Sequence, residues 1–285
     1  MNILVTGGAG FVGTNLIKKL LSEGHSVVSI DNYYTGKEEN HILNARYYKY
    51  DIRDIEDYSV FGIFDVVYHL AAIARIQPSF KEPLEYFETN STATYIISQY
   101  CSKYNIPLIY AGSSSHHSGK FKNPYTFSKD IGEEIIKLHQ EHYGLKSSIA
   151  RFYNVYGPYH LKDGGYCTLI GKWEKALEDG QPLTIYGDGT KRRDFTHIYD
   201  IVDGLIKIKE KEVWGYTFEL GRGKNYSINE IADMFGSEKI YEDNKPGEAD
   251  VTLCDITLAK EILGWSATID IGDYIKEYLI KNHKI

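Results

Sequence analysis

Tyr125 and Lys129 are the two residues of this sequence whose types and spacing most directly suggest chemistry. They lie in NPYTFSKD, residues 123–130, where Asn123 is a good helix N-cap and Pro124 suits the first helical position. A spacing of four would put the phenol and the ammonium on one face of that helix. A phenol has an ordinary pKa of about 10, but a nearby ammonium and a positive helix terminus both favour the phenolate. The pair could therefore accept a proton from a hydroxyl group while hydride leaves the same carbon.

The same Tyr-x-x-x-Lys spacing recurs at Tyr33/Lys37 and Tyr241/Lys245, so spacing alone does not identify a site. The first pair follows a predicted strand through a glycine, and the second is expected in a polar loop. Upstream of Tyr125, IYAGSSS ends a predicted strand in a run of hydroxyls, and neighbouring parallel strands end at the same edge of a sheet. We expect a serine of this run to relay a proton to Tyr125. An ordinary amphipathic helix face is the alternative explanation of the pair.

A glycine-rich turn is the second chemical feature. ILVTGGAGFVG places Gly7, Gly10 and Gly13 between the first predicted strand and an amphipathic helix. Glycine permits the tight turn and lets the backbone approach a pyrophosphate, and the helix N-terminus supplies free N–H groups. Asp31 ends the next strand, where a carboxylate can accept hydrogen bonds from both ribose hydroxyls of NAD and would repel the 2′-phosphate of NADP. A tight turn without a ligand is the alternative.

Two further strand ends could contact a dinucleotide. Asp51 and Ile52, in YDIRD, could hold an adenine through one polar and one apolar contact. Ala71 and Ala72 follow another strand and are small enough for a flat cofactor to lie close. On spacing alone, Asp51 could equally be a solvated carboxylate in a turn.

The elements that must position these residues alternate along the first half of the chain. Helical patterns at 11–23, 83–104 and 124–143 separate short strands that are mostly apolar on both faces, at 2–6, 26–31, 47–52, 64–72, 106–114 and 147–155. Buried strands separated by helices predict a parallel sheet with right-handed crossovers. The predicted fold class is α/β, a Rossmann-type doubly wound parallel sheet with a smaller C-terminal α/β substrate lobe. We expect residues 1–155 to form the dinucleotide-binding domain, with about 190–210 returning to it, and 156–285 to form mainly the substrate lobe.

The composition excludes several function classes. The 285 residues are 42% hydrophobic and 25% charged, as in a globular protein, and a net charge of −7 argues against a nucleic-acid surface. There is no apolar run of membrane-spanning length and no signal-peptide pattern. Cys101, Cys167 and Cys254 show no disulfide framework or metal-ligand spacing, so we expect a cytoplasmic protein. His116 and His117 have no partner at ligand spacing and are expected to be solvated loop histidines rather than metal ligands.

Several stretches carry a family resemblance because they occur together and in order: TGGAGFVG, DNYYTG, DIRD, HLAAIARIQPS, YTFSK, RFYNVYGP, GDGTKRRDFTHIYD and AKEILGW. The chain resembles the extended short-chain dehydrogenase/reductases, specifically the NAD-dependent nucleotide-sugar epimerase/dehydratase family, nearly end to end. The resemblance implies a tightly held NAD and a nucleoside-diphosphate sugar, with UDP favoured by the family. It also implies a homodimer formed through the helices at 83–104 and 124–143.

The resemblance also assigns residues. It implies that Tyr125, Lys129 and Ser113 are catalytic, with Ser114 a near rival of Ser113. The residues expected to contact NAD are Gly7, Gly10, Phe11, Val12, Gly13, Asp31, Asn32, Asp51, Ile52, Leu70, Ala71, Ala72, Tyr125 and Lys129. The residues expected to contact the substrate are Ser113, Ser114, Tyr125, Asn154, Arg193 and Lys245. Of these, Asn154 and Arg193 would hold the diphosphate, although an arginine in a glycine-rich hairpin is often only solvated.

Two departures from the family pattern concern specificity. The stretch from Ser113 to Tyr125 is short and lacks the family's VYG, and Lys245 stands where the family commonly has an arginine. Lysine keeps the positive charge but loses bidentate recognition.

The predicted reaction is epimerisation at carbon 4 through a transient keto-sugar, with NAD accepting and returning the hydride. Family dehydratases and decarboxylases carry a carboxylate close after the catalytic Ser or Thr, whereas Ser113 is followed by Ser, Ser and His. Dehydration, decarboxylation or keto-sugar reduction are the alternatives within the family. The alternative that is not an enzyme is a non-catalytic dinucleotide-sensing protein.

Overall fold

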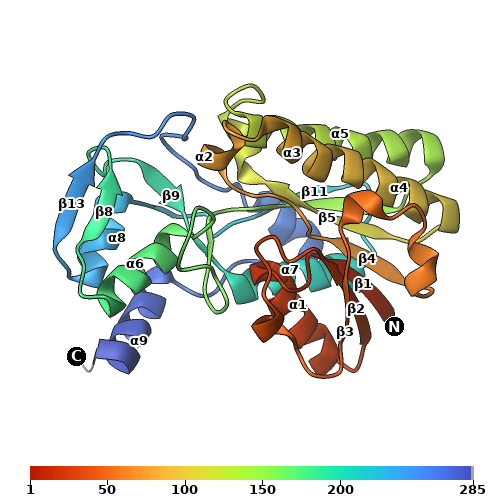
Figure 1. The fold of residues 1–285 in the computed structure, drawn as a ribbon, viewed down its shortest axis with the longest axis horizontal. Coiled ribbons are helices and arrows are strands. Elements are labelled where there is room, and N and C mark those ends of the chain that lie inside the picture. The colour runs from red at the N-terminus through yellow and green to blue at the C-terminus, as the bar shows by residue number, and fades with distance from the viewer. Residues whose placement is uncertain (284–285) are drawn as a thin grey trace.

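Seven parallel strands form the centre of the structure, a computed structural model that describes residues 1–283 (Figure 1). Their order is β11-β6-β5-β4-β1-β2-β3. The bounds are β1 (Asn2–Thr6), β2 (Ser26–Asp31), β3 (Arg46–Lys49), β4 (Val66–His69), β5 (Leu108–Ser113), β6 (Ser147–Phe152) and β11 (Thr217–Leu220). The sheet order reverses between β1 and β4, and ligands of such sheets bind at this switch point, beyond the carboxyl ends of the strands.

Helices cover both faces of the sheet, which explains why its strands are apolar on both sides (Figure 1). Ile3 and Val5 of β1 face one apolar cluster, whereas Leu4 faces the other, because side chains alternate along a strand. The first cluster is covered by α1 (Phe11–Ser22) and α7 (Ile198–Glu210). The second is covered by α4 (Ala93–Tyr104) and α5 (Pro124–Tyr143), which pack against each other. The predicted α/β fold class is confirmed.

The predicted helix at 83–104 contains a change of helix type. It begins as α3 (Pro83–Phe87), continues through a π-helical turn at Glu88–Thr92, and ends as α4. A π-turn widens a helix locally and is frequent at functional sites. Here it contains Asn90, a buried side chain that bonds to residues on two other segments.

The smaller lobe lies at the carboxyl edge of the sheet, on the left in Figure 1. Its own apolar core includes Trp173 and Phe235, whose rings pack edge to face. Its elements are β7 (Val155–Tyr156), α6 (Leu169–Glu178), β8 (Leu183–Tyr186), β9 (Arg192–Asp194), β10 (Thr196–His197), β12 (Asn225–Ser227), α8 (Ile228–Phe235), β13 (Lys239–Glu242) and α9 (Ile271–His283). Two segments after residue 155 belong to the sheet domain rather than to the lobe: α7 packs on α1, and β11 pairs with β6 in the central sheet. The division at residue 155 stays a prediction.

Two sequence expectations differ from the structure. Tyr241 lies on β13, paired with Ile185 of β8, so its prediction as a loop residue is wrong. The strand predicted at 47–52 runs over Arg46–Lys49, and Ile52 begins a short 3₁₀ turn over Ile52–Asp54. The turn forms because the Asp51 carboxylate accepts the Arg53 N–H and ends the extended backbone.

Candidate active site

The predicted Tyr125–serine contact is present at the carboxyl end of β5. Asn123 caps α5 by accepting the Thr126 N–H at 2.8 Å, which sets Tyr125 in the first helical turn. The Tyr125 hydroxyl donates to Ser113 Oγ at 3.1 Å, and Ser113 Oγ donates to Ser115 Oγ at 2.9 Å. Ser113 rather than Ser114 therefore contacts the tyrosine. Ser115 extends the hydroxyl chain, and the sequence analysis missed it although it belongs to the same run of serines.

Lys129 lies one turn along α5 and is buried, with 4% of its surface exposed. Its Nζ lies 4.1 Å from the centre of the Tyr110 ring, a cation–π contact. Burial lowers the pKa of Lys129 to about 7, while the nearby charge of Glu133 opposes that shift. A buried ammonium held only by a ring face is poorly compensated, so this position serves chemistry better than stability.

Burial also raises the pKa of Tyr125, which works against the phenolate that a proton acceptor needs. Two contacts act the other way: the hydrogen bond to Ser113 and the positive charge of Arg75 both lower the pKa of Tyr125. The sequence analysis did not include Arg75, because it lies 50 residues before Tyr125 in a segment read only for its small residues.

The glycines of the turn after β1 let neighbouring backbone segments lie close to it. Gly7 has a φ of 73°, and a Cβ there would meet the Ala71 backbone at 2.9 Å. A Cβ on Gly13 would lie 2.2 Å from the Gly7 carbonyl oxygen. Gly10 caps α1 without any side-chain hydrogen bond, so the N–H groups of the first turn remain available to a ligand. Phe11 and Val12 form that first turn.

Asp31 lies beside this turn, as expected of a carboxylate that binds a ribose. Its Oδ2 accepts the Ala9 N–H at 2.9 Å and its Oδ1 accepts the Tyr33 N–H at 2.8 Å. Burial raises the pKa of Asp31, and these two backbone hydrogen bonds lower it. Leu70, Ala71 and Ala72 follow β4 on the other side of the turn, where the Ala71 N–H donates to Thr6 Oγ1 at 3.2 Å.

Asp51 is an ion-pair partner in addition to its predicted role. Arg53 donates to both its oxygens, at 2.9 and 2.8 Å, and Asn32 Nδ2 donates to Oδ2 at 2.8 Å. The hydrogen bond from Arg53 is the main reason that the pKa of Asp51 falls to about 2. The structure thus brings the predicted Asn32 and Asp51 together, next to the buried Ile52.

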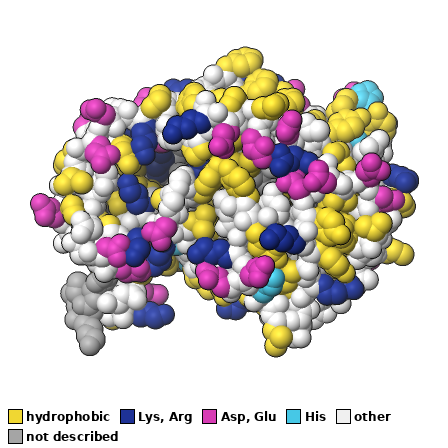
Figure 2. Space-filling model, in the orientation of Figure 1, with side chains coloured by type: hydrophobic (Ala, Val, Ile, Leu, Met, Phe, Trp, Pro, Cys, Tyr) yellow, Lys and Arg dark blue, Asp and Glu magenta, His cyan; other side chains and the backbone are white. Residues whose placement is uncertain are grey.

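Of the other predicted substrate residues, Asn154 lies between β6 and β7, and Arg193 and Lys245 come from the lobe. Asn154 has a φ of 32°, and its Nδ2 donates to the Asp194 carbonyl at 2.7 Å. Arg193 is 9% exposed; its Nη1 donates to the Arg192 and Asp250 carbonyls at 3.0 and 3.3 Å, and its Nη2 lies 3.4 Å from Glu248. The Lys245 Nζ lies 3.5 Å from the centre of the Tyr186 ring, whose hydroxyl accepts Lys172 Nζ at 3.0 Å. The sequence analysis missed Lys172 and Tyr186. Figure 2 shows Lys and Arg side chains around a hollow between the lobe and the sheet.

His116 and His117 are not simply solvated, which corrects the sequence expectation. His116 Nδ1 lies 2.9 Å from Asp130 Oδ1, and His117 Nε2 lies 2.9 Å from Glu219 Oε1. The partners are 14 and 102 residues away in the chain, so no local spacing reveals them. Arg151 joins Glu219 to Glu133 on α5, at 2.9 and 2.6 Å, and thus ties the short loop to the catalytic helix. Within residues 1–283, no group of three or more His, Cys, Asp or Glu could hold a metal ion.

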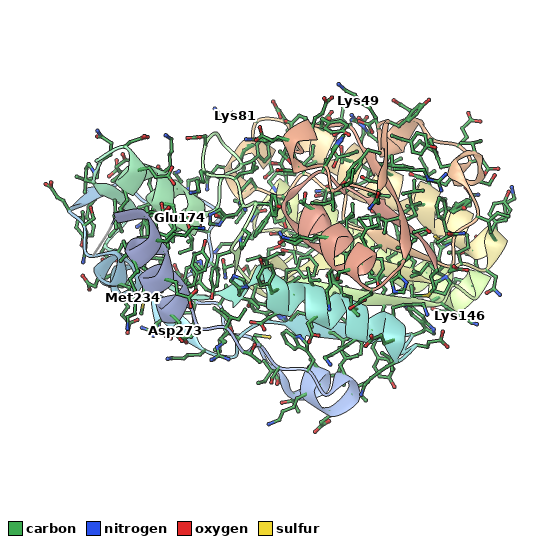
Figure 3. All side chains as sticks on the ribbon, turned by 90° about the horizontal axis from the view of Figure 1, so that it is seen from below. Lys49, Lys81, Lys146, Glu174, Met234 and Asp273 are labelled. Carbon is green, nitrogen blue, oxygen red and sulfur yellow. The ribbon has the colours of Figure 1, made fainter. Side chains whose placement is uncertain are left out.

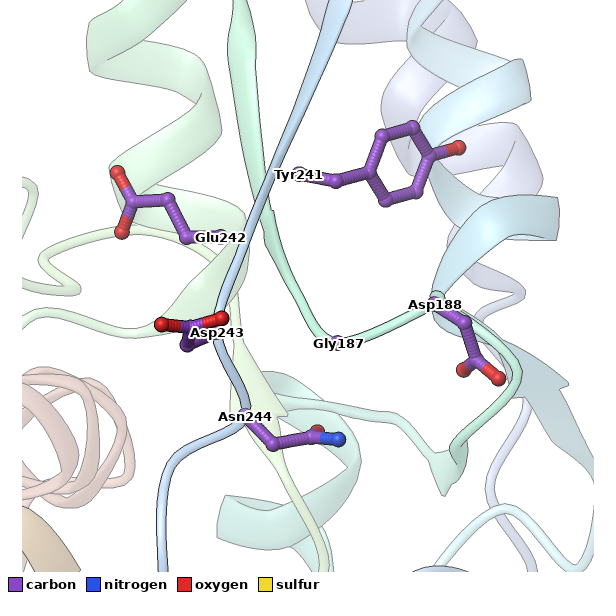
Figure 4. Close-up of a pocket in the computed structure, with 6 residues that line it drawn as sticks. All are labelled: Gly187, Asp188, Tyr241, Glu242, Asp243 and Asn244. Carbon is purple, nitrogen blue, oxygen red and sulfur yellow. The ribbon is translucent and has the colours of Figure 1, made fainter.

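A pocket of about 830 Å³ lies elsewhere on the lobe (Figure 4). It is lined by Gly187, Asp188, Tyr241, Glu242, Asp243 and Asn244. Its three carboxylates would repel a diphosphate, and none of the predicted site residues lines it. The candidate active site is therefore the Tyr125–Ser113 edge rather than this pocket. In the part of the chain that the structure describes, no helix is long and apolar enough to cross a membrane.

Comparison with known proteins agrees with the geometry. The profile of the NAD dependent epimerase/dehydratase family matches residues 3–221. A UDP-glucuronate 4-epimerase of Thermodesulfobacterium geofontis is 31% identical, over 96% of this chain and 93% of its own length. A UDP-N-acetyl-alpha-D-glucosaminuronate decarboxylase of Bacillus cytotoxicus is 32% identical, over 80% of this chain and 77% of its own.

Solved structures of related enzymes have the same fold. UDP-glucose 4-epimerase of Thermotoga maritima, crystallised with UDP-glucose, has a TM-score of 0.92 and 29% identity, with 99% of each chain covered. UDP-glucuronic acid 4-epimerase of Bacillus cereus, in complex with UDP-glucuronic acid and NAD, has a TM-score of 0.90 and 28% identity, again with 99% of each chain covered.

The doubly wound sheet, the glycine turn and the Ser113–Tyr125–Lys129 set define an extended short-chain dehydrogenase/reductase. Within that class, the chain belongs to the NAD dependent epimerase/dehydratase family. The predicted resemblance is confirmed, and with it NAD as the cofactor of the family. Its assignment to individual residues stays a prediction.

The buried ammonium yields a stability prediction for the nucleotide-free protein. The pKa of Lys129 is about 7 when folded and about 10.4 when unfolded. Between these values the unfolded chain binds more protons, so wild-type stability rises with pH through this window. We expect Lys129→Met to be more stable than wild type by about 1–3 kcal/mol at pH 7 and below, with the difference lost toward pH 10.

Urea unfolding at pH 6.5 and pH 9.5 measures this difference, with Lys137→Met, an exposed lysine of the same helix, as the matched control. A Lys129→Met difference that is the same at both pH values would show that Lys129 keeps an ordinary pKa in the folded chain.

Proposed function

We propose that this protein is an NAD-dependent 4-epimerase of a nucleoside-diphosphate sugar, with a UDP-sugar as substrate. The observation that carries the proposal is the Ser113–Tyr125 hydrogen bond at 3.1 Å beside a buried lysine, with no carboxylate following the serine. These groups move a proton at a sugar hydroxyl and contain nothing dedicated to eliminating water. The 4-epimerases among the relatives and solved structures support the same reaction.

The chain's residues have distinct roles in this mechanism. Bound NAD supplies the hydride acceptor and donor. Tyr125 takes the proton of the carbon-4 hydroxyl, directly or through Ser113, as the carbon–hydrogen bond breaks and a carbon–oxygen double bond forms. The keto-sugar then turns over, the hydride returns to its other face, and Tyr125 returns the proton. Lys129 and the Arg75 charge favour the phenolate that begins the cycle.

The two carboxylates near the site do not support dehydration or decarboxylation, because both are already paired with other residues. Asp130 is 5% exposed and pairs with His116, and Glu133 is 2% exposed and pairs with Arg151. Neither is available as an acid or base in the sugar pocket. A dinucleotide sensor would not need the aligned Tyr125, Ser113 and Ser115 hydroxyls.

Proton NMR of the purified protein with UDP-sugars and no added cofactor tests the reaction. We expect inversion of the carbon-4 signal in one substrate, and a loss of about 100-fold or more in kcat for Tyr125→Phe because the proton acceptor is removed. Tyr33→Phe, in a Tyr-x-x-x-Lys pair away from the serines, is the control and should retain activity. A keto or decarboxylated product, or an unchanged Tyr125→Phe enzyme, would refute the proposal.

The hydrogen bond to Tyr125 distinguishes Ser113 from Ser114 as the candidate proton relay. Ser113→Ala removes the hydroxyl bonded to Tyr125 and should lower kcat by about 100-fold. Ser114→Ala, which has no contact to Tyr125 in the structure, should change kcat by less than about threefold. Steady-state kinetics of both variants on the same UDP-sugar decides, and the reverse ranking would move the relay to Ser114.

We further propose a cytoplasmic homodimer that associates through α4 and α5. Leu84 on α3, which leads into α4, is 66% exposed, and Leu138 and Tyr143 on α5 are 43% and 57% exposed. Apolar area of this kind on neighbouring helices is typical of a subunit interface. The three cysteines are all unpaired, which suits a reducing compartment, and cell fractionation would test the location.

Sedimentation of wild type and Leu138→Asp tests the dimer. We expect wild type at twice the chain mass and Leu138→Asp at the monomer mass, because a buried charge without a partner opposes association. Ile63→Asp, at a side chain that is 85% exposed on a different segment, should leave the dimer intact. A wild-type monomer at micromolar concentration would contradict the proposal.

A further inference from the structure

Arg75 lies on a rigid segment between β4 and the short helix α2 (Ile76–Ser79). Two residues earlier, the Ile73 N–H donates to Asn90 Oδ1 at 2.8 Å and the Ile73 carbonyl accepts Asn90 Nδ2 at 3.0 Å. Asn90 Nδ2 also donates to Ser128 Oγ of α5 at 3.0 Å. The segment that carries Arg75 is thereby bonded to the helix that carries Tyr125 and Lys129.

The guanidinium of Arg75 is oriented but not neutralised. Its Nε donates to the Tyr166 carbonyl at 2.9 Å, and it forms no ion pair with any residue in 1–283. The other arginines near the sheet are different: Arg53 pairs with Asp51 at 2.8 Å, and Arg151 pairs with Glu133 at 2.6 Å. Burial lowers the pKa of Arg75, as expected for a cation without a carboxylate partner.

Its neighbours place this cation beside the reacting groups. Arg75 is the N-cap residue of α2, which packs on α5, and its positive charge lowers the pKa of Tyr125 in the first turn of α5. The rings of Tyr86 and Tyr125 lie 6.3 Å apart, and Glu248 pairs with Arg193, the predicted diphosphate residue. Arg75 therefore lies near Tyr125, the proposed proton acceptor, whereas Arg193 and Lys245 are the residues predicted to contact the diphosphate.

Two tyrosine hydroxyls connect the loop that orients Arg75 to other segments of the chain. The Tyr34 and Tyr166 hydroxyls are 3.0 Å apart, and Tyr34 also donates to Glu82 at 3.4 Å. Tyr166 thus joins a segment after β2 to the backbone carbonyl that orients Arg75.

We propose that Arg75 binds the carboxylate of a uronic-acid substrate, so that the preferred substrate is a nucleoside-diphosphate uronate rather than a neutral hexose. The proposal rests on the proposed epimerase function. A guanidinium fork matches a carboxylate through two parallel hydrogen bonds. In a uronate the carboxylate is attached to carbon 5, next to the reacting carbon 4, so one residue can contact it while Tyr125 and Ser113 contact the carbon-4 hydroxyl. A neutral hydroxymethyl group would leave the cation unpaired.

The test compares UDP-glucuronate with UDP-glucose, which share nucleotide and diphosphate and differ in the oxidation state of carbon 6. We expect wild type to have a kcat/KM at least about 100-fold higher for UDP-glucuronate, and Arg75→Gln to reduce that ratio by about 100-fold, mainly through KM. Arg75→Lys should be intermediate because it keeps the charge without the fork. The ratio is the readout because any effect of Arg75 on Tyr125 acts on both substrates equally.

Lys81→Gln is the matched control. It removes one positive charge from the same segment, and Lys81 is exposed at the outer edge of the molecule (Figure 3). The ratio should not change. Thermal unfolding should show Arg75→Gln to be at least as stable as wild type, because a partly buried cation without a carboxylate partner is removed.

Other outcomes overturn the inference. An equal loss for both substrates in Arg75→Gln would assign Arg75 to the diphosphate or to Tyr125 alone. A wild-type preference for UDP-glucose would overturn the Arg75 proposal and leave the epimerase intact. If no UDP-sugar turns over, the proposed function fails, and calorimetric affinities of the two sugars for wild type and Arg75→Gln still decide whether Arg75 binds the carboxylate.

Discussion

The close approach of three chain segments at Gly7 is the constraint on which the rest of the site depends. With a Cβ at Gly7 or Gly13, the turn after β1 could not lie against the Ala71 backbone or the start of α1. Because the strands are parallel, that contact brings the carboxyl ends of β1, β2 and β4 to one edge, with β5 and its serines next along the sheet. Asp31, Ala71 and Ser113 then lie at this one edge of the sheet, at or just after the carboxyl ends of β2, β4 and β5.

The second feature of the structure is that some of its charged side chains away from solvent are paired and others are not. Arg151 and Glu133 compensate each other, and together with Glu219 and His117 they tie the short loop to α5. Lys129 and Arg75 are not compensated in this way: one lies over a tyrosine ring and the other is held by a backbone carbonyl. A protein keeps such unpaired cations at a cost in stability, and they concentrate where chemistry or binding uses them. Both come from segments next to Tyr125, the proposed proton acceptor.

Local pattern predicted most of the elements. The strands at 2–6 and 26–31 and the helix at 124–143 agree with the structure at both ends, since each is bounded by glycine, a helix cap or a buried strand end. The predictions were wrong where long-range contacts set the backbone conformation. Tyr241 is extended because β13 pairs with β8. The helix that begins at residue 83 widens into a π-turn around Asn90, whose side chain bonds to Ile73. Neither partner lies close in the sequence, so neither could be read from it.

For the site, the sequence by itself determined which groups are predicted to carry the chemistry: the glycine turn, Asp31, the serine run and the Tyr125/Lys129 pair, whose types and spacing are local properties of single segments. Only the tertiary structure decided which serine contacts Tyr125, that His116 and His117 have carboxylate partners, and that the segment of Arg75 packs near Tyr125. These relations join segments from about 12 to 102 residues apart. They depend on how the helices pack on the sheet, and a linear pattern does not encode that geometry.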